Sequence, residues 1–290
     1  MRTAGFHMPR QPKIALIWIL SIGAWVAIQM SYILVHQLSD VPLELNLLHV
    51  FLSVIDDTFT NHILWELSLN AILLFSCLVL CKHLIQQAKL YRQWNSYLLS
   101  KKNNEMTKKL TEILNHESLR IEVVSEPKLM AMTIGFWKPR IILSSGMMNR
   151  FSKDELGAIV YHELYHYKHR HPLQHFVLTI IAECLAFLPI VKGLVQYYKV
   201  WMELLADRYA IYRAGSEYHL AQVLITILRS EKSYKYAHGV HLAKESVNYR
   251  LQQLLDPHSS VHMPIFEWKS LLPSTIVLIF MLVIIILGCI

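Results

Sequence analysis

Charged residues are scarce in this 290-residue chain: they make up 17% of it, whereas hydrophobic residues make up 54%. A soluble globular domain usually has about 25% charged residues. Residues 14–35 and 271–290 contain no charged side chain, and residues 63–81 contain only Glu66. Each run reaches the roughly 20 apolar residues that a helix needs to cross a bilayer. The sequence therefore predicts a membrane protein, with transmembrane helices at 14–36, 63–82 and 271–290.

A cleavage site of small residues is also missing after the first apolar run, where the chain continues as "HQLSDVPLEL". A secretory signal peptide would carry such a site, and its apolar core would be shorter. We therefore expect the first run to be retained as a membrane anchor.

Lysine and arginine are absent from residues 36–62, which carry four acidic side chains. Basic residues instead precede the first span and follow the second. The positive-inside rule then places the N-terminus (1–13) and the large region 83–270 in the cytoplasm, and the loop 37–62 outside it. Because this topology explains the net charge of +7, we expect no direct nucleic-acid partner.

Only four cysteines are present, and all of them lie in apolar runs: Cys77, Cys81, Cys184 and Cys289. None shows the spacing of a zinc cluster or of a redox pair. We interpret them as small buried hydrophobic residues.

A polar stretch does interrupt the apolar chain at residues 161–172, "YHELYHYKHRHP". Two segments upstream, "LRIEVV" (119–124) and "PRIILSS" (139–145), are rich in β-branched residues and predict strands, with a turn headed by Gly135 between them. Ser152 and Glu155 match a capping box, so a helix is expected to begin at Lys153 and to carry the polar stretch.

His162 and His166 stand four positions apart, so one helix face presents both imidazoles to a zinc ion. Glu163 lies beside that face and can act as the general base for a zinc-activated water. A third ligand is available in "MELLADRYA" (202–210), where Glu203 precedes Asp207 by one helical turn. We expect one Zn²⁺ per chain, with Asp207 hydrogen-bonded to a ligand imidazole.

The competing interpretation of this stretch is a polar helix face whose histidines are solvated. A second metal site at His171 and His175, which are also four apart, is geometrically possible, but a solvated or interfacial helix end is favoured.

The apolar segment 172–195 is long enough for a span. A single crossing would place Glu203 on the opposite side of the bilayer from His162 and His166, which zinc–ligand distances of about 2 Å forbid. We therefore predict a hairpin within 172–198 that turns near Leu188 and Pro189. Each arm, about 15 residues, is too short for a full crossing, so the hairpin is expected to be buried or partly inserted.

The stretch "IGFWKPRIILSSGMMNRFSKDELGAIVYHELYHYKHRHPL", followed by Glu-x-x-Ala-Asp at 203–207, resembles the BlaR/MecR antirepressor metallopeptidases, a beta-lactam-sensor family of integral membrane zinc peptidases of the gluzincin type. The resemblance covers about 130–215, and residues 247–256 show a weaker similarity to the same family. His171 stands where that family often has aspartate, and Ser144-Ser145 where a proline is common.

The resemblance implies a mainly α membrane protein with a cytoplasmic α+β gluzincin-like zinc peptidase domain, a small β-sheet and several spans in a bacterial-type plasma membrane. It also implies that the substrate is a cytoplasmic or membrane protein, such as a transcriptional repressor. We expect the substrate backbone to pair with an edge strand at the residues preceding the active helix: Arg140, Ile141, Ile142, Leu143 and Ser144.

The C-terminal penicillin-binding sensor domain of that family is expected to be lacking, and no Ser-x-x-Lys motif lies in an outside segment. The signal would then enter through the 36–62 loop, a separate sensor subunit or a homodimer.

Three functions remain open at this point: a regulatory zinc endopeptidase, a quality-control or peptide-processing protease of the HtpX or CAAX type, and a non-enzymatic signalling or immunity protein in the membrane. Glu163 favours the first two, because a purely structural zinc site needs the ligands but not the base.

Overall fold

The computed structural model describes residues 10–40, 62–114, 120–232, 240–255 and 263–288. The chain is mainly helical with one small three-stranded sheet, as predicted. It divides into two compact units. The first comprises Gln87–Leu178 and Gln196–Met263 with the chain start up to Pro12, and the second comprises Lys13–Gln86, Thr179–Val195 and Pro264–Ile290. Four helices contribute residues to both units: α1 (Arg10–Asp40), α3 (His62–Lys101), α7 (His171–Cys184) and α8 (Pro189–Ala214).

The second unit contains long apolar helices. In α1 (Arg10–Asp40) the stretch Arg10–Ser31, and in α3 the stretch Asn70–Leu98, are long and apolar enough to cross a membrane by length and composition. The last helix, α11 (Trp268–Gly288), adds a shorter apolar stretch among the described residues. The predicted N-terminus up to residue 9 and most of the predicted loop, 41–61, lie outside the described residues.

Within the region of the predicted hairpin, α7 ends at Cys184 and α8 begins at Pro189. Within the second unit this turn is bonded to two other helices. The Ser76 hydroxyl of α3 donates to the Cys184 carbonyl (3.1 Å). The Ile190 N–H, one of the unpaired donors of the first turn of α8, donates to Ser274 Oγ of α11 (3.0 Å). The hairpin tip is therefore part of the same packed unit as the apolar helices.

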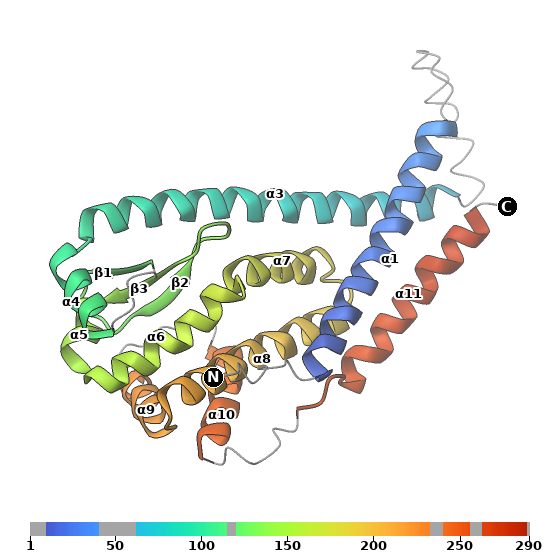
Figure 1. Cartoon of the computed structure of the whole chain (residues 1–290). Helices are drawn as coiled ribbons and strands as arrows, with labels where there is room; N and C mark the ends of the chain where they lie inside the picture. The colour runs from blue at the N-terminus through green and yellow to red at the C-terminus, as the bar shows by residue number, and fades with distance from the viewer. Residues whose placement is uncertain (1–9, 41–61, 115–119, 233–239, 256–262, 289–290) are drawn as a thin grey trace. The chain divides into compact units, whose positions relative to one another are not determined.

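The first unit is built around the sheet (Figure 1), whose strands are β1 (Ile121–Val124), β2 (Ala131–Ile134) and β3 (Arg140–Ser144) in the order β1-β3-β2. β3 pairs with β1 in parallel and with β2 antiparallel. The remaining helices of this unit are α4 (Asn104–Leu114), α5 (Ser145–Arg150), α6 (Lys153–Lys168), α9 (Tyr218–Lys232) and α10 (Val240–Leu255).

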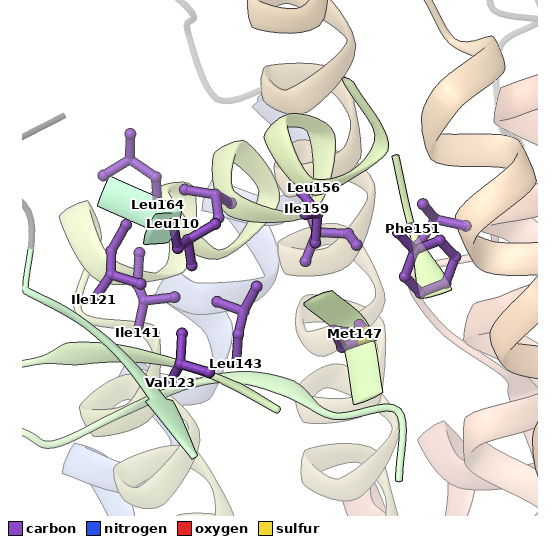
Figure 2. Packing of buried hydrophobic residues seen from close by; sticks show 12 residues of the cluster. Leu110, Ile121, Val123, Ile141, Leu143, Met147, Phe151, Leu156, Ile159 and Leu164 are labelled. Atoms are coloured by element: carbon purple, nitrogen blue, oxygen red, sulfur yellow. The ribbon is translucent and has the colours of Figure 1, made fainter. Parts of the chain in front are cut away.

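The two faces of the sheet are covered by different helices because side chains alternate along each strand. Figure 2 shows Val123 and Leu143 pointing from the strands toward Leu110 of α4 and Leu164 of α6, within one buried apolar cluster. On the other face Ile142 packs in a second cluster with residues of α3, among them Leu98, Trp94 and Tyr97. The sheet is thus buried on both sides, and α6 is fixed against one of them.

The start of α6 agrees with the predicted capping box. Ser152 Oγ accepts from the Glu155 N–H, and Glu155 Oε2 accepts from the Ser152 N–H (2.8 Å). Leu156, Ile159 and Leu164 of this helix are buried in the cluster that faces the sheet. Local capping and one apolar stripe therefore set both the start and the rotation of the helix that carries the histidine motif.

Two predictions about the strands are wrong. Ala131–Ile134 forms a strand, although only a turn was expected before Gly135; the turn itself is real, since Gly135 has φ +97° and an added Cβ would lie 2.9 Å from the Lys138 carbonyl oxygen. In addition, Arg140–Ser144 is not an edge strand, because β1 and β2 pair with it on its two sides. Its backbone has no free hydrogen-bonding edge for a substrate.

The free edge belongs to β2. The outer edge of β1 is covered by the residues after α3, where the Asn103 N–H donates to the Val123 carbonyl (2.8 Å) and the Ser125 N–H donates to the Lys101 carbonyl (2.8 Å). No backbone partner covers the outer edge of β2 among the residues that the structure describes.

Candidate metal centre

Three side chains from two helices converge in the first unit. His162 and His166 lie one turn apart on α6, and Glu203 comes from the middle of α8. The two Nε2 atoms are 3.1 Å apart. Glu203 Oε2 lies 3.5 Å from His162 Nε2, and Glu203 Oε1 lies 3.6 Å from His166 Nε2. The three residues form a group that could hold a metal ion.

These separations fit one ion of tetrahedral geometry. Donor atoms about 2 Å from a tetrahedral centre lie roughly 3.3 Å from one another. The two Nε2 atoms are 3.1 Å apart, and each has a different oxygen of Glu203 beside it, at 3.5 and 3.6 Å. Two imidazole nitrogens and one carboxylate oxygen are also a donor set that zinc accepts, with a fourth position left open in catalytic sites. The residues therefore fit zinc both in chemistry and in spacing.

A buried ion-pair network supports one of the two imidazoles. His162 Nδ1 lies 2.8 Å from Asp207 Oδ1, although its N–H direction is off the line to that oxygen. Asp207 is fully buried and is held by Arg250 of α10 through two hydrogen bonds, 2.7 Å from Nε and 2.8 Å from Nη2. Arg250 also reaches Glu203, with Nη1 3.2 Å from Oε2. One guanidinium thus orients two carboxylates of the centre.

The other imidazole has a different neighbour. His166 Nδ1 lies 2.6 Å from His171 Nδ1, on the first residue of α7. His171 is 8% exposed. Burial, and then the neighbouring charges at His166 and His169, lower the pKa of His171 to about 3, so its ring is neutral.

Glu163 is buried next to the two histidines and contacts β2. The Thr133 hydroxyl lies 2.8 Å from Glu163 Oε2 and 2.9 Å from the Glu163 carbonyl oxygen, and it can donate to either. Because Thr133 belongs to the strand with the free edge, the carboxylate of the motif is fixed beside that edge.

The electrostatics of the centre favour positive charge between the imidazoles. Burial alone would lower the pKa of His162, but the carboxylates of Asp207 and Glu203 outweigh it and raise the pKa to about 9. Burial would raise the pKa of Glu203, yet the histidine charges and Arg250 hold it well below its usual value. A carboxylate that stays ionised beside one buried and one partly buried imidazole is suited to bind a divalent cation.

The structure therefore brings together His162, His166, Glu203, Asp207 and Glu163, as the sequence pattern indicated. It does not bring the Arg140–Ser144 backbone to a free edge. The sequence did not predict the contacts of Arg250, for which the only indication was the weaker family similarity at 247–256. It did not predict the contact of Thr133 either, because the strand that carries Thr133 was not predicted.

A helix-borne His-Glu-x-x-His motif with a glutamate of a later helix beside it is typical of metallopeptidases. The family described as BlaR1 peptidase M56 matches residues 50–254. Since the match covers well over half of the chain, the chain belongs to this peptidase family. No curated protein matches the chain.

Proposed function

We propose that this protein is a membrane-embedded, zinc-dependent endopeptidase of the gluzincin type. The observation that carries the proposal is the convergence of His162, His166 and Glu203, whose ligand atoms lie within 4.8 Å of one another. Membership of the peptidase family supports hydrolysis rather than a purely structural metal site. A zinc ion bound there would polarise a peptide carbonyl and lower the pKa of a water molecule.

Glu163 is the general base and acid of this proposal. Its carboxylate lies next to both ligand histidines in sequence and is buried, so a proton that it takes from water can be passed to the departing amine nitrogen of the cleaved peptide. Thr133 keeps one carboxylate oxygen in place by donating to it. Asp207 orients His162. Arg250 pairs with Asp207 and Glu203, so that the fully buried Asp207 is not an unpaired charge.

β2 is the substrate-binding strand in place of Arg140–Ser144. The Ser144 N–H donates to the Met130 carbonyl, and the Ile141 N–H donates to the Arg120 carbonyl, away from β2. With the observed register, the backbone groups of residues 131 and 133 then face the free edge. An extended peptide could add there as a further strand, beside Glu163.

The proposed substrate is a protein that is cytoplasmic or has a cytoplasmic face, and a transcriptional repressor is the specific proposal. Two apolar helices of membrane-spanning length and the charge pattern of the sequence support a multi-pass protein with a cytoplasmic centre. Family membership supports regulated proteolysis. A separate sensor subunit or a second copy would supply the signal.

Co-expression tests this function. Candidate repressors encoded beside the gene would be produced with the wild-type chain or with Glu163→Gln, and cleavage followed by mass spectrometry. Glu183→Gln, which changes an exposed carboxylate in α7 remote from the motif in sequence, is the matched control. We expect cleavage with wild type and Glu183→Gln and none with Glu163→Gln. Equal cleavage with Glu163→Gln would overturn the proposal.

A further inference from the structure

We infer that His171 is a positioning residue for the metal ligand His166: its neutral imidazole accepts a hydrogen bond from His166 Nδ1 and thereby aims the Nε2 lone pair of His166 at the metal. The inference rests on the proposed zinc site. Its starting observation is the 2.6 Å contact between the two Nδ1 atoms, which is the shortest polar contact made by either ligand histidine in the described part of the chain.

Donor and acceptor roles in this contact follow from the metal site. His166 Nε2 faces His162 Nε2 and Glu203, so it is the nitrogen that must be unprotonated when it binds a metal. A neutral imidazole with a bare Nε2 carries its proton on Nδ1. That N–H points to His171 Nδ1, which must therefore be a bare acceptor, with the His171 proton on Nε2.

The backbone places His171 at this position through an unusual residue. Arg170, between α6 and α7, has φ +51°, a left-handed conformation that non-glycine residues rarely adopt. It ends α6 as glycine commonly does, and its carbonyl accepts from the N–H groups of Leu173 and Gln174 in the first turn of α7. The chain therefore turns back at once, and the first side chain of α7 meets the last turn of α6.

Charge balance explains why the acceptor is neutral. The net charge of the site is zero when one divalent cation is bound. The cation and the guanidinium of Arg250 together offset the three carboxylates, which belong to Glu163, Glu203 and Asp207. Asp207 already supplies a carboxylate to His162. The aspartate that the family often has at position 171 would add one negative charge to this balance, at a residue that is only 8% exposed. An imidazole supplies the acceptor without the charge.

The two ligand histidines are therefore not equivalent. A carboxylate partner raises the basicity of a ligand imidazole more than a neutral partner does. His162, next to Asp207, is the stronger donor, and His166 is the ligand whose binding depends most on alignment. Loss of the His171 acceptor should accordingly weaken metal binding while the rest of the fold stays in place.

The test is the zinc affinity of the full chain in detergent, measured by competition with a chromogenic chelator. His171→Leu removes the acceptor, and His171→Asn offers a carbonyl oxygen close to the position of Nδ1. His169→Leu is the matched control, since His169 bonds the Tyr165 carbonyl rather than a metal ligand. We expect His171→Leu to bind zinc about 10- to 100-fold more weakly, and His171→Asn and His169→Leu to remain close to wild type.

Unchanged affinity of His171→Leu, or an equal loss in His171→Asn and His169→Leu, would overturn this inference and leave the zinc site standing. A wild-type chain that binds no zinc would overturn the proposed function and this inference with it. Nitrogen-15 NMR of histidine-labelled wild type tests the tautomer without any substitution: the zinc-bound protein should show His171 with a bare Nδ1, and a protonated Nδ1 would contradict the assignment.

Discussion

Thr133 and Glu163 are joined by a hydrogen bond of 2.8 Å between the threonine hydroxyl and carboxylate Oε2. Residue 133 thus has two functions: its side chain holds the proposed base, and its backbone faces the free edge of the sheet. A substrate strand added at that edge would lie beside the base, because Thr133 contacts both. This relationship connects peptide binding to the position of the proton acceptor.

Replacing Thr133 by valine, which keeps the shape but removes the hydroxyl, should lower kcat about 10- to 100-fold. A hydrogen bond to a charged group contributes about 1.5–3 kcal/mol. Thr133→Ser is the control and should retain most activity. Steady-state kinetics on preparations with equal zinc content would check this, and an unaltered kcat in Thr133→Val would show that the hydroxyl has no part in positioning Glu163.

Proline at position 131 should separate substrate binding from folding. The Ala131 N–H faces the free edge, so its loss removes no hydrogen bond of the sheet. We expect Ala131→Pro to fold and to raise KM for peptide substrates by about 2- to 10-fold, the range of one neutral hydrogen bond. Met132→Pro, whose N–H faces β3, should instead destabilise the sheet. If Ala131→Pro folds and leaves KM unchanged, the edge of β2 does not bind the substrate.

Arg250 is expected to be essential for the stability of the centre. Arg250→Met would leave Asp207, which is fully buried, without its two guanidinium hydrogen bonds. Removing one partner of a buried ion pair costs about 3–5 kcal/mol. Thermal or denaturant unfolding should show a loss of that size. Arg208→Met, which removes a part-buried hydrogen bond to Gln253 but no carboxylate contact, should cost less.

Ser152→Ala should destabilise the first unit by about 1 kcal/mol, because Ser152 caps the N-terminus of α6. The cap is at the opposite end of α6 from His166, so zinc affinity should be unchanged once the protein is folded. Unfolding curves and zinc titration on the same preparation would separate the two quantities. A loss of zinc affinity without a loss of stability would contradict this account of the cap.

Local signals made part of this structure predictable from the sequence. The capping box at Ser152 set the start of α6, helical spacing put His162 and His166 on one face, and the requirement that Glu203 reach them implied the hairpin before Pro189. Each of these inferences depended on residues close in sequence or on one strong distance constraint.

Long-range pairing could not be predicted in the same way. β2 has four residues and no clear alternation of polar and apolar side chains, and its place beside β3 depends on a hairpin turn, so the edge was assigned to the wrong strand. Arg250 lies 43 residues after Asp207, and nothing in the spacing of the two indicates that they meet. His171 looked like one of several solvated histidines until the turn at Arg170 brought it to His166.

The most direct test of the central claim is the zinc content of the detergent-purified chain, measured by elemental analysis for wild type, His166→Ala and Glu163→Gln. We expect close to one zinc per chain in wild type and in Glu163→Gln, because Glu163 is not a ligand, and little in His166→Ala. No zinc in wild type, or equal zinc in His166→Ala, would contradict a metal centre at His162, His166 and Glu203.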